Sequence, residues 1–255
     1  MAKWLRFNHQ GKTGFGTLEG ETIQVHAGDM FENPQATGEV LGLGDVQVLT
    51  PTKPTKMVAL WNNFKALAAK LGNPAPTAPL YLLKAPNSFL AHGETIRKPA
   101  SYDGKVVYEG EIGIVIGKRA SAVSEADAPK HIFGYTVIND VTAAEIIQAD
   151  KTFAQWVRAK SYDTFGVFGP VVETDVDPMS LSIKTILNGD ERQNYPVNDC
   201  FYSPAQLVSL ISQDLTLEPG DVIAIGTSVG VGSMKPGSEV SVTIEGIGTL
   251  ANRYE

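Results

Sequence analysis

The stretch YEGEIGIVIGK, residues 108–118, places two carboxylates in a run that is otherwise typical of a buried β-strand. Strand side chains alternate between two faces, so Glu109 and Glu111 share one face with Gly113 and Val115. Two interpretations are open at this point. Half-exposed antiparallel strands carry glutamates on their solvated face, whereas the small and apolar continuation of this face suits a cleft. In either case both acids converge on one side of the strand.

A third carboxylate ends another apolar strand, GYTVIND, residues 134–140. Taken alone, Asp140 is better explained as the N-cap of a following helix, because Asp is a preferred capping residue. With Glu109 and Glu111 it makes a set of hard oxygen ligands that suits Mg²⁺, Mn²⁺ or Ca²⁺. Carboxylates ~4 Å apart repel by about 4 kcal/mol at an effective dielectric of ~20. Such a cluster therefore needs protonation or a divalent cation, and we favour the cation.

The composition is that of a globular protein. Of the 255 residues, 43% are hydrophobic and 19% charged, and no apolar run approaches the roughly 20 residues that cross a bilayer. The N-terminal sequence MAKWLRFNHQ lacks the pattern of a signal peptide, so we expect a cytoplasmic protein without a membrane partner. The net charge of −7 and the scattered Lys and Arg residues argue against nucleic acid as a partner. The single cysteine, Cys200, is best explained as a packed thiol.

The pattern of apolar residues predicts an α+β fold that is predominantly β. Short alternating segments before a Pro-rich break suggest a small N-terminal β-unit, residues 1–52, followed by a main domain, residues 53–255. We predict the main domain to be a mixed-sheet β-roll with a hairpin over residues 180–195 and a few packing helices. Those helices are expected over residues 62–72, with an Asn cap, and over 124–133, 142–150 and 204–214. The Pro-rich loop 73–79 is a possible lid.

Several spaced motifs follow one another in a fixed order: E-x-E at 109–111, N-D at 139–140 after G-Y-T, K-S-Y-D-T-F-G-x-F-G-P from Lys160, and G-D-V-I-A-I-G-T-S-x-G-V-G from Gly220. From about Lys56 to the C-terminus this order resembles the fumarylacetoacetate hydrolase family. The resemblance implies a β-roll of the type of that family's C-terminal domain, usually assembled as a homodimer. It also implies that Glu109, Glu111 and Asp140 hold Mg²⁺ or Mn²⁺, with Ca²⁺ possible in crystals.

The same resemblance implies roles for four further residues. Lys160 matches the family's lysine beside the metal, where an ammonium group can stabilise developing negative charge or relay a proton; without the motif, an exposed surface lysine would be the better explanation. The loop GTSVGVG, residues 226–232, matches the substrate-binding loop. Gly226 would let the backbone approach the substrate, and the Thr227 hydroxyl would bind its carboxylate. Phe64 would contribute to an apolar wall of the pocket.

The segment NNFKALAAKLG departs from the family pattern. Hydrolytic members resemble N-Y-x-x-H-x-x-E here, a His and a Glu that activate water. This chain has Leu67 and Lys70 at those two positions. Lys65, Lys70 and His92 are candidate replacements, although lysines on the solvated face of a helix and a structural histidine are the simpler explanations. Ala144 and Ile147 stand where relatives have Arg and Gln, which indicates either an unusual substrate for the family or a more apolar pocket. Ser228 in place of Pro indicates a less rigid loop.

The expected function is therefore that of a Mg²⁺- or Mn²⁺-dependent hydrolase that cleaves a carbon–carbon bond in a 2-oxo acid or 1,3-dicarbonyl compound. The missing His and Glu leave a first alternative, a hydratase, isomerase, tautomerase or decarboxylase in which an enolate is protonated. A second alternative is a binding protein that holds an oxo acid without turnover. In each case the expected partner is a small oxo acid.

Overall fold

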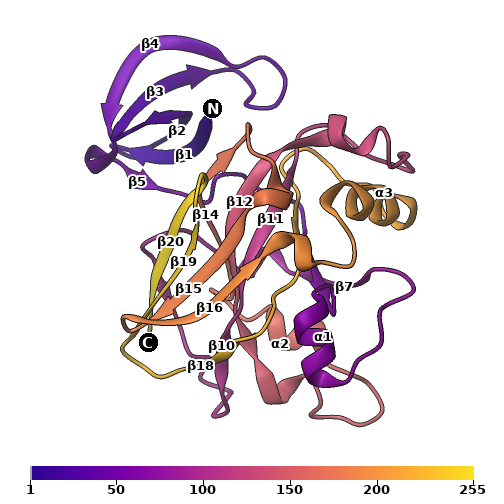
Figure 1. Ribbon diagram of the computed structural model, residues 1–255. Helices are drawn as coiled ribbons and strands as arrows, with labels where there is room; N and C mark the ends of the chain where they lie inside the picture. The colour runs from indigo at the N-terminus through magenta and orange to yellow at the C-terminus, as the bar shows by residue number, and fades with distance from the viewer. Residues whose placement is uncertain (1) are drawn as a thin grey trace.

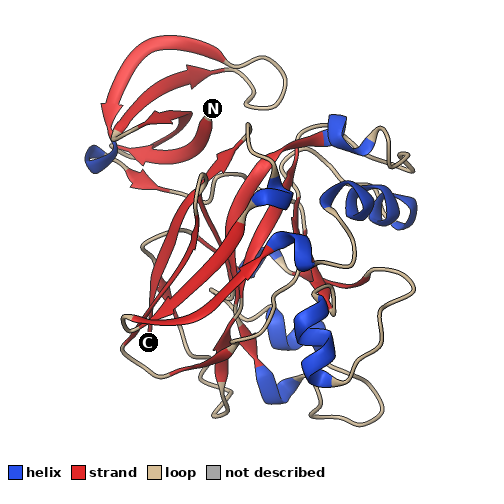
Figure 2. Ribbon diagram, viewed as in Figure 1, coloured by secondary structure: helices blue, strands red, loops and turns tan. Residues whose placement is uncertain are grey.

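Strands dominate the fold, and the computed structural model describes residues 2–255 (Figures 1 and 2). The largest sheet has twelve strands. Its main path runs through β4 (Gln35–Gly42), β3 (Thr22–Ala27), β2 (Lys12–Glu19), β1 (Lys3–His9), β14 (Gly166–Glu173), β12 (Ile132–Asp140), β11 (Gly110–Ile116), β17 (Val222–Ala224), β6 (Met57–Trp61) and β7 (Leu80–Lys84). Two short strands, β5 (Gln47–Val48) and β8 (Phe89–Leu90), pair with β1 and β14.

Two smaller sheets and a few helices complete the chain. The five-stranded sheet has the order β16 (Asp190–Pro196), β15 (Ser182–Leu187), β19 (Ser238–Ile244), β20 (Gly248–Tyr254) and β9 (Thr95–Ile96). The three-stranded sheet has the order β13 (Thr142–Ala143), β10 (Val106–Tyr108) and β18 (Gly232–Met234). The α-helices are α1 (Lys65–Leu71), α2 (Trp156–Lys160) and α3 (Pro204–Asp214), and all three lie on one side of the β-roll (Figure 2). Short 3₁₀ turns are η1 (Leu43–Asp45), η2 (Pro86–Ser88), η3 (Ala128–His131), η4 (Ala144–Ile146), η5 (Pro178–Ser180) and η6 (Val197–Asp199).

The two faces of the large sheet have different roles. One face, which includes Ile112 and Ile114 of β11, is buried in the main core together with Val242 and Leu250 of the five-stranded sheet. The opposite face carries Glu111, which lies across from Ile138 of β12, and Ile138 lies across from Phe168 of β14. Ile138 and Phe168 belong to a second apolar cluster. The carboxylates therefore stand at the edge of an apolar interior.

The sheet also curls, which brings distant strands together. After β7 the chain passes through η2, and β8 then pairs with β14, near the middle of the same sheet. This return places the end of β7 beside the ends of β12 and β14. Residues more than fifty positions apart in the sequence can thus meet at one end of the roll.

The strands β1–β5 form the lobe at the top of Figure 1. This lobe continues the large sheet, because Lys3 and Trp4 of β1 pair with Glu173 and Val172 of β14. The division of the chain at residue 52 stays a prediction.

The predominantly β, mixed-sheet fold is confirmed, and so are the hairpin β15–β16 and the helix α3. Two expected helices are wrong. Within residues 124–133 the only helical segment is the turn η3, and the last two residues already belong to β12. Pro129 lacks the N–H that a longer helix would need. Residues 142–150 begin with β13, which pairs with β10, and continue only as η4. Asp140 is accordingly not a helix cap, and α2 was not foreseen.

Helix α1 forms where expected and ends at Gly72 in the left-handed conformation, but the expected Asn cap is wrong. Phe64 occupies the N-cap position, and the Asn63 side chain instead donates to the carbonyl of Ile225. The N–H of Ala66 is accepted by the carboxylate of Asp199, which is distant in sequence. Tertiary contacts therefore supply the cap that a local side chain was expected to provide.

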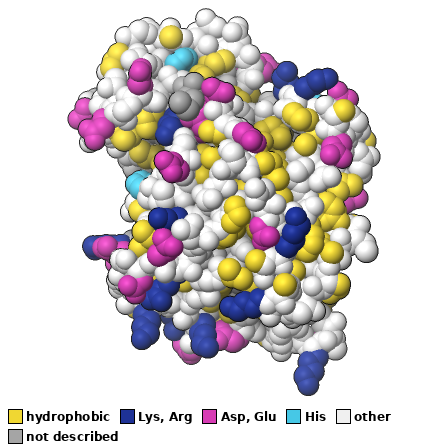
Figure 3. Space-filling view, in the orientation of Figure 1, with side chains coloured by type: hydrophobic (Ala, Val, Ile, Leu, Met, Phe, Trp, Pro, Cys, Tyr) yellow, Lys and Arg dark blue, Asp and Glu magenta, His cyan; other side chains and the backbone are white. Residues whose placement is uncertain are grey.

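On the face seen in Figure 3, acidic and basic side chains are interspersed over the strands rather than separated into large patches. Within residues 2–255, none of the helices has both the length and the apolar character that a membrane span requires.

Candidate metal centre

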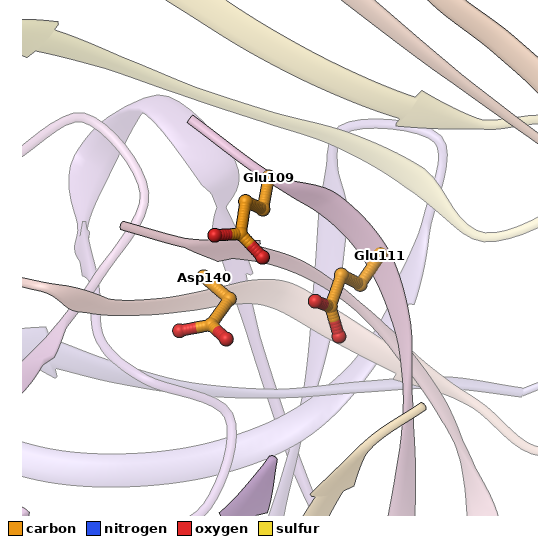
Figure 4. A group of neighbouring side chains, drawn as sticks. All are labelled: Glu109, Glu111 and Asp140. Atoms are coloured by element: carbon orange, nitrogen blue, oxygen red, sulfur yellow. The ribbon is translucent and has the colours of Figure 1, made fainter. Parts of the chain in front are cut away.

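The structure brings the three predicted carboxylates together. Glu109 comes directly before β11, Glu111 lies within it, and Asp140 is the last residue of β12. The backbone N–H of Asp140 donates to the carbonyl of Glu109 at 2.8 Å, which fixes the register of the two strands at this point. One oxygen from each carboxylate lies within 4.8 Å of the others, and Figure 4 shows the three groups turned toward a common space. Glu111 and Asp140 are fully buried.

Two lysines bond to this cluster. Lys160, the last residue of α2, donates to Asp140 Oδ2 at 2.6 Å and to Glu109 Oε2 at 3.1 Å. Lys84, the last residue of β7, donates to Asp140 Oδ1 and, at 3.3 Å, to the carbonyl of Val141. Both lysines are buried. Lys160 was expected here, whereas Lys84 was missed, and its only signal in the sequence is a charge at the end of the apolar strand LYLLK.

Burial and neighbouring charges shift the titration of the cluster in different directions. Burial, with the charges of Asp140 and Glu109, raises the pKa of Glu111 well above its ordinary value. Burial also raises the pKa of Glu109, although Lys160 opposes the shift. Burial would raise the pKa of Asp140 as well, but Lys160 and Lys84 outweigh it and the pKa is lowered. Burial lowers the pKa of Lys84, whereas for Lys160 the three carboxylates outweigh burial and raise the pKa.

The donor set fits a divalent cation. Glu111 Oε2 accepts the N–H of Gly226 at 2.8 Å, but Glu111 Oε1 is buried and has no hydrogen-bond partner among the described residues. Buried polar atoms are almost always partnered, and an orphaned oxygen that lies between two further carboxylates fits a missing ligand. With all three carboxylates ionised, three negative charges would face two ammonium groups, and the raised pKa of Glu111 reflects the burial and repulsion of that third charge. A hard divalent cation satisfies both the orphaned oxygen and the charge.

The loop that follows β17 borders the cluster. Gly226 has a φ of +99°, and a Cβ there would lie 3.4 Å from the Leu60 carbonyl oxygen, so glycine suits this position. The hydroxyl of Thr227 donates to the Gly110 carbonyl at 3.1 Å and accepts from Gln193 at 2.9 Å. Its proton is therefore engaged within the protein, and the substrate-binding role of Thr227 stays a prediction. The backbone N–H of Ser228 donates to the hydroxyl of Tyr195. Within residues 2–255, the N–H groups of Thr227 and Val229 have no hydrogen-bond acceptor.

The region around α1 offers no obvious base. Leu67 is half-buried, while Lys65 and Lys70 are exposed. His92 Nδ1 accepts the N–H of Ala251 at 3.1 Å, which is a structural contact.

Phe64 is fully buried and packs edge to face on Tyr195 with ring centroids 5.0 Å apart. It thus acts as a core residue here, and its contact with substrate stays a prediction. Beside it, Trp61 and Trp156 lie 4.9 Å apart and join the end of β6 to α2. This aromatic pair connects the strand that leads to α1 with the helix that carries Lys160.

Lys84 gives a prediction about stability. In metal-free protein, Lys84→Met is expected to lower the free energy of unfolding by about 3–5 kcal/mol, because a buried carboxylate loses one of its two ammonium partners. Lys56→Met is a matched control, because Lys56 also pairs with a buried carboxylate, that of Asp221. Asp221 keeps hydrogen bonds from Thr55 and Glu218, so the control should lose only about 1 kcal/mol. Urea unfolding measures both, and equal losses would contradict this account of Lys84.

Comparison with known proteins gives matches over nearly the whole chain. The family model described as "Fumarylacetoacetate (FAA) hydrolase C-terminal" matches residues 56–255, and "Rv2993c-like, N-terminal" matches residues 2–51. "Protein Rv2993c" of Mycobacterium tuberculosis is 38% identical over 93% of this chain and 92% of its own. "Oxaloacetate tautomerase YisK" of Bacillus subtilis is 33% identical over 92% of this chain and 83% of its own. The solved structure of a 2-hydroxyhepta-2,4-diene-1,7-dioate isomerase from Mycobacterium marinum is 36% identical, covers 100% of this chain and 98% of its own, and superimposes with a TM-score of 0.91.

Proposed function

The chain belongs to the fumarylacetoacetate hydrolase family, and we propose that it is an isomerase or tautomerase of a 2-oxo acid that requires a divalent cation. The observation that carries the proposal is the buried group Glu109, Glu111 and Asp140 with its orphaned oxygen, next to a helix that lacks a water-activating His and Glu. The carboxylate group favours a bound cation, and such a cation would make the carbon–hydrogen bond next to the 2-oxo group of the substrate more acidic. The absence of the His and Glu disfavours hydrolysis.

The cation would be held by Glu109, Glu111 and Asp140, which are suited to Mg²⁺ or Mn²⁺. When bound, it would supply Lewis-acid stabilisation of the negative charge on the 2-oxo oxygen. The remaining steps fall to the residues of the chain. Lys84 and Lys160 each donate a hydrogen bond to Asp140 and fix the orientation of its carboxylate. Asp140 would therefore need no reorganisation to bind the cation.

Lys160 is proposed as the catalytic residue. Its ammonium group is buried against Asp140 and Glu109, and Glu109 is the member of the cluster with some exposure, 12% of its side chain. A charged donor at that position stabilises negative charge that develops on the substrate and can deliver a proton to it. The backbone N–H groups of Thr227 and Val229 are proposed to bind the substrate carboxylate, a function that unpaired amides in a Gly-rich loop can perform.

The reaction type follows from what α1 lacks. Carbon–carbon hydrolysis needs a base that activates water and a partner that orients the base. Leu67 cannot act as a base, and Lys70 is exposed. Two relatives support proton transfer without cleavage, since one is named an oxaloacetate tautomerase and the other a dienedioate isomerase.

Carbon–carbon hydrolysis is the second candidate. It is favoured by the name of the family and by Lys65 and Lys70, which project from the helix that carries the base in hydrolytic members. A homodimer, a cytoplasmic location and the closing of loop 73–79 also remain proposals.

The test is a product analysis. Oxaloacetate and acetylpyruvate are followed by ultraviolet absorbance with Mg²⁺, Mn²⁺ or a chelator, and the products are identified by mass spectrometry. We expect metal-dependent interconversion of enol and keto forms with the carbon chain intact. Release of pyruvate and a carboxylic acid from acetylpyruvate would overturn the proposal in favour of the hydrolase.

A further inference from the structure

A cavity of about 440 Å³ lies beside the segment that follows Lys160, outside the carboxylate centre. Its wall includes Arg97, Lys98, Ser161, Tyr162 and Thr164. The residues come from two segments that are distant in sequence, one after β9 and one between α2 and β14. None of these five residues belongs to the proposed catalytic machinery.

The cavity has positive charge that the protein does not neutralise. Within residues 2–255, the guanidinium group of Arg97 has no hydrogen-bond or ion-pair partner. The ammonium group of Lys98 has only a distant contact, 3.8 Å from Asp103, whose side chain is exposed. The one acid in the wall, Asp163, accepts a hydrogen bond from Asn87 at 2.7 Å. Two cationic side chains are thus left to face the cavity against a single acid that is already partnered.

Hydroxyl groups add donors to the same wall. Ser161 Oγ accepts the N–H of Ala85 at 3.0 Å, and Thr164 Oγ1 accepts the N–H of Arg97 at 2.9 Å. In both cases the oxygen is held in place by an N–H, and the hydroxyl proton has no acceptor among the described residues. The ring of Tyr162 packs against Tyr102 and Phe165, and its hydroxyl is buried away from solvent. Two hydroxyl protons, those of Ser161 and Thr164, are therefore available to one ligand.

We propose that this cavity binds a small multivalent oxyanion, such as phosphate or a dicarboxylate. Such an ion accepts hydrogen bonds from several directions, and an Arg guanidinium matches its oxygens in pairs. The cavity is also distinct in charge from the metal centre, which has an excess negative charge without its cation. Ser161 follows Lys160 in the sequence, and its Oγ accepts the N–H of Ala85, which follows Lys84. A ligand bound to Ser161 would therefore lie one residue away from each of the two lysines that contact Asp140.

The experiment is a titration of metal-free protein, kept in a chelator, with inorganic phosphate, malonate or chloride, followed by calorimetry. We expect phosphate or malonate to bind and chloride not to compete at equal concentration. Arg97→Gln should weaken binding about tenfold or more, because hydrogen bonds between charged groups are the strongest contributors. Ser161→Ala, which removes one hydroxyl of the wall, should weaken it several-fold. Arg119→Gln, which removes one exposed positive charge elsewhere, is the matched control and should change binding less than twofold.

The proposal is overturned if the wild type binds neither phosphate nor malonate at millimolar concentration. It is also overturned if Arg97→Gln binds as the wild type does, or if Arg119→Gln weakens binding as much as Arg97→Gln. The titration uses neither divalent cation nor oxo acid. Its failure therefore says nothing about the proposed enzymatic function, and failure of that function leaves this site standing.

Discussion

Asp140→Asn is expected to lower metal-dependent turnover by about 10³-fold. A bound cation stabilises the charge of the transition state by several kcal/mol, and a loss of ~4 kcal/mol corresponds to that factor. Asp140 is the residue on which the centre depends, since Lys84 and Lys160 both donate to it. An amide at this position has no charge, and its NH₂ group would face one of the ammonium donors. Both the cation and the orientation of Lys160 should therefore be lost.

The measurements are kcat/KM with Mn²⁺ and the affinity for Mn²⁺ by calorimetry. Asp140→Glu keeps the charge and should retain part of both. Asp190→Asn, at an exposed position in the β15–β16 hairpin, controls for the loss of one negative charge. Turnover and metal affinity of Asp140→Asn within about threefold of the wild type would contradict the assignment of Asp140 as a ligand, since a ligand loss should cost far more.

Glu111→Gln is expected to have opposite effects on stability and activity. In metal-free protein the Glu111 carboxylate is fully buried beside two other carboxylates, and its Oε1 has no partner in the described chain. Where Glu111 is ionised, each close pair of charges repels by roughly 4 kcal/mol at an effective dielectric of ~20, which together with burial raises its pKa, while burying an unpaired amide group costs about 1–3 kcal/mol. The variant should therefore be more stable than the wild type without metal, by about 1 kcal/mol or more.

With metal the order should reverse. A ligand present at ~100 times its Kd stabilises the folded state by about 2.7 kcal/mol, so Mg²⁺ or Mn²⁺ should raise the unfolding temperature of the wild type. Glu111→Gln should lose most of that rise, and its turnover should fall by at least about 10². Thermal unfolding with and without chelator measures both effects, and Glu239→Gln, an exposed change of the same charge, is the control. A variant that is less stable without metal, or that keeps the full rise with metal, would show that Glu111 has another role.

The part of the site that could be predicted from the sequence is the part that depends on strand periodicity. Alternation in YEGEIGIVIGK put Glu109 and Glu111 on one face, and the apolar run GYTVIND put Asp140 at a strand end. Periodicity alone cannot predict that β11 pairs with β12. The prediction that Asp140 lies beside the two glutamates therefore rested on the order of the motifs. The pairing of Glu111 with Ile138 supplies that register.

The contacts that could not be predicted are long-range. Lys84 meets Asp140 only because the sheet curls until β8 pairs with β14, and no local pattern in LYLLK indicates this. The Thr227 hydroxyl is hydrogen-bonded to Gln193 and to the Gly110 carbonyl, which belong to other strands, and its role toward substrate stays a prediction. The helix expected after Asp140 does not form, because its first two residues pair with β10 as the strand β13. Tertiary pairing decided each of these positions over local propensity.

The most direct test of the central claim is proton–deuterium exchange at C3 of oxaloacetate, followed by NMR in D₂O as Mg²⁺ or Mn²⁺ is added to metal-free protein. Exchange is measured above a protein-free blank with the same metal. If the carboxylate centre and Lys160 interconvert enol and keto forms, the exchange rate should rise with the cation, saturate, and be absent in Asp140→Asn, with the carbon chain intact. An exchange rate equal to the blank at saturating metal, or one unchanged by chelator, would contradict the account.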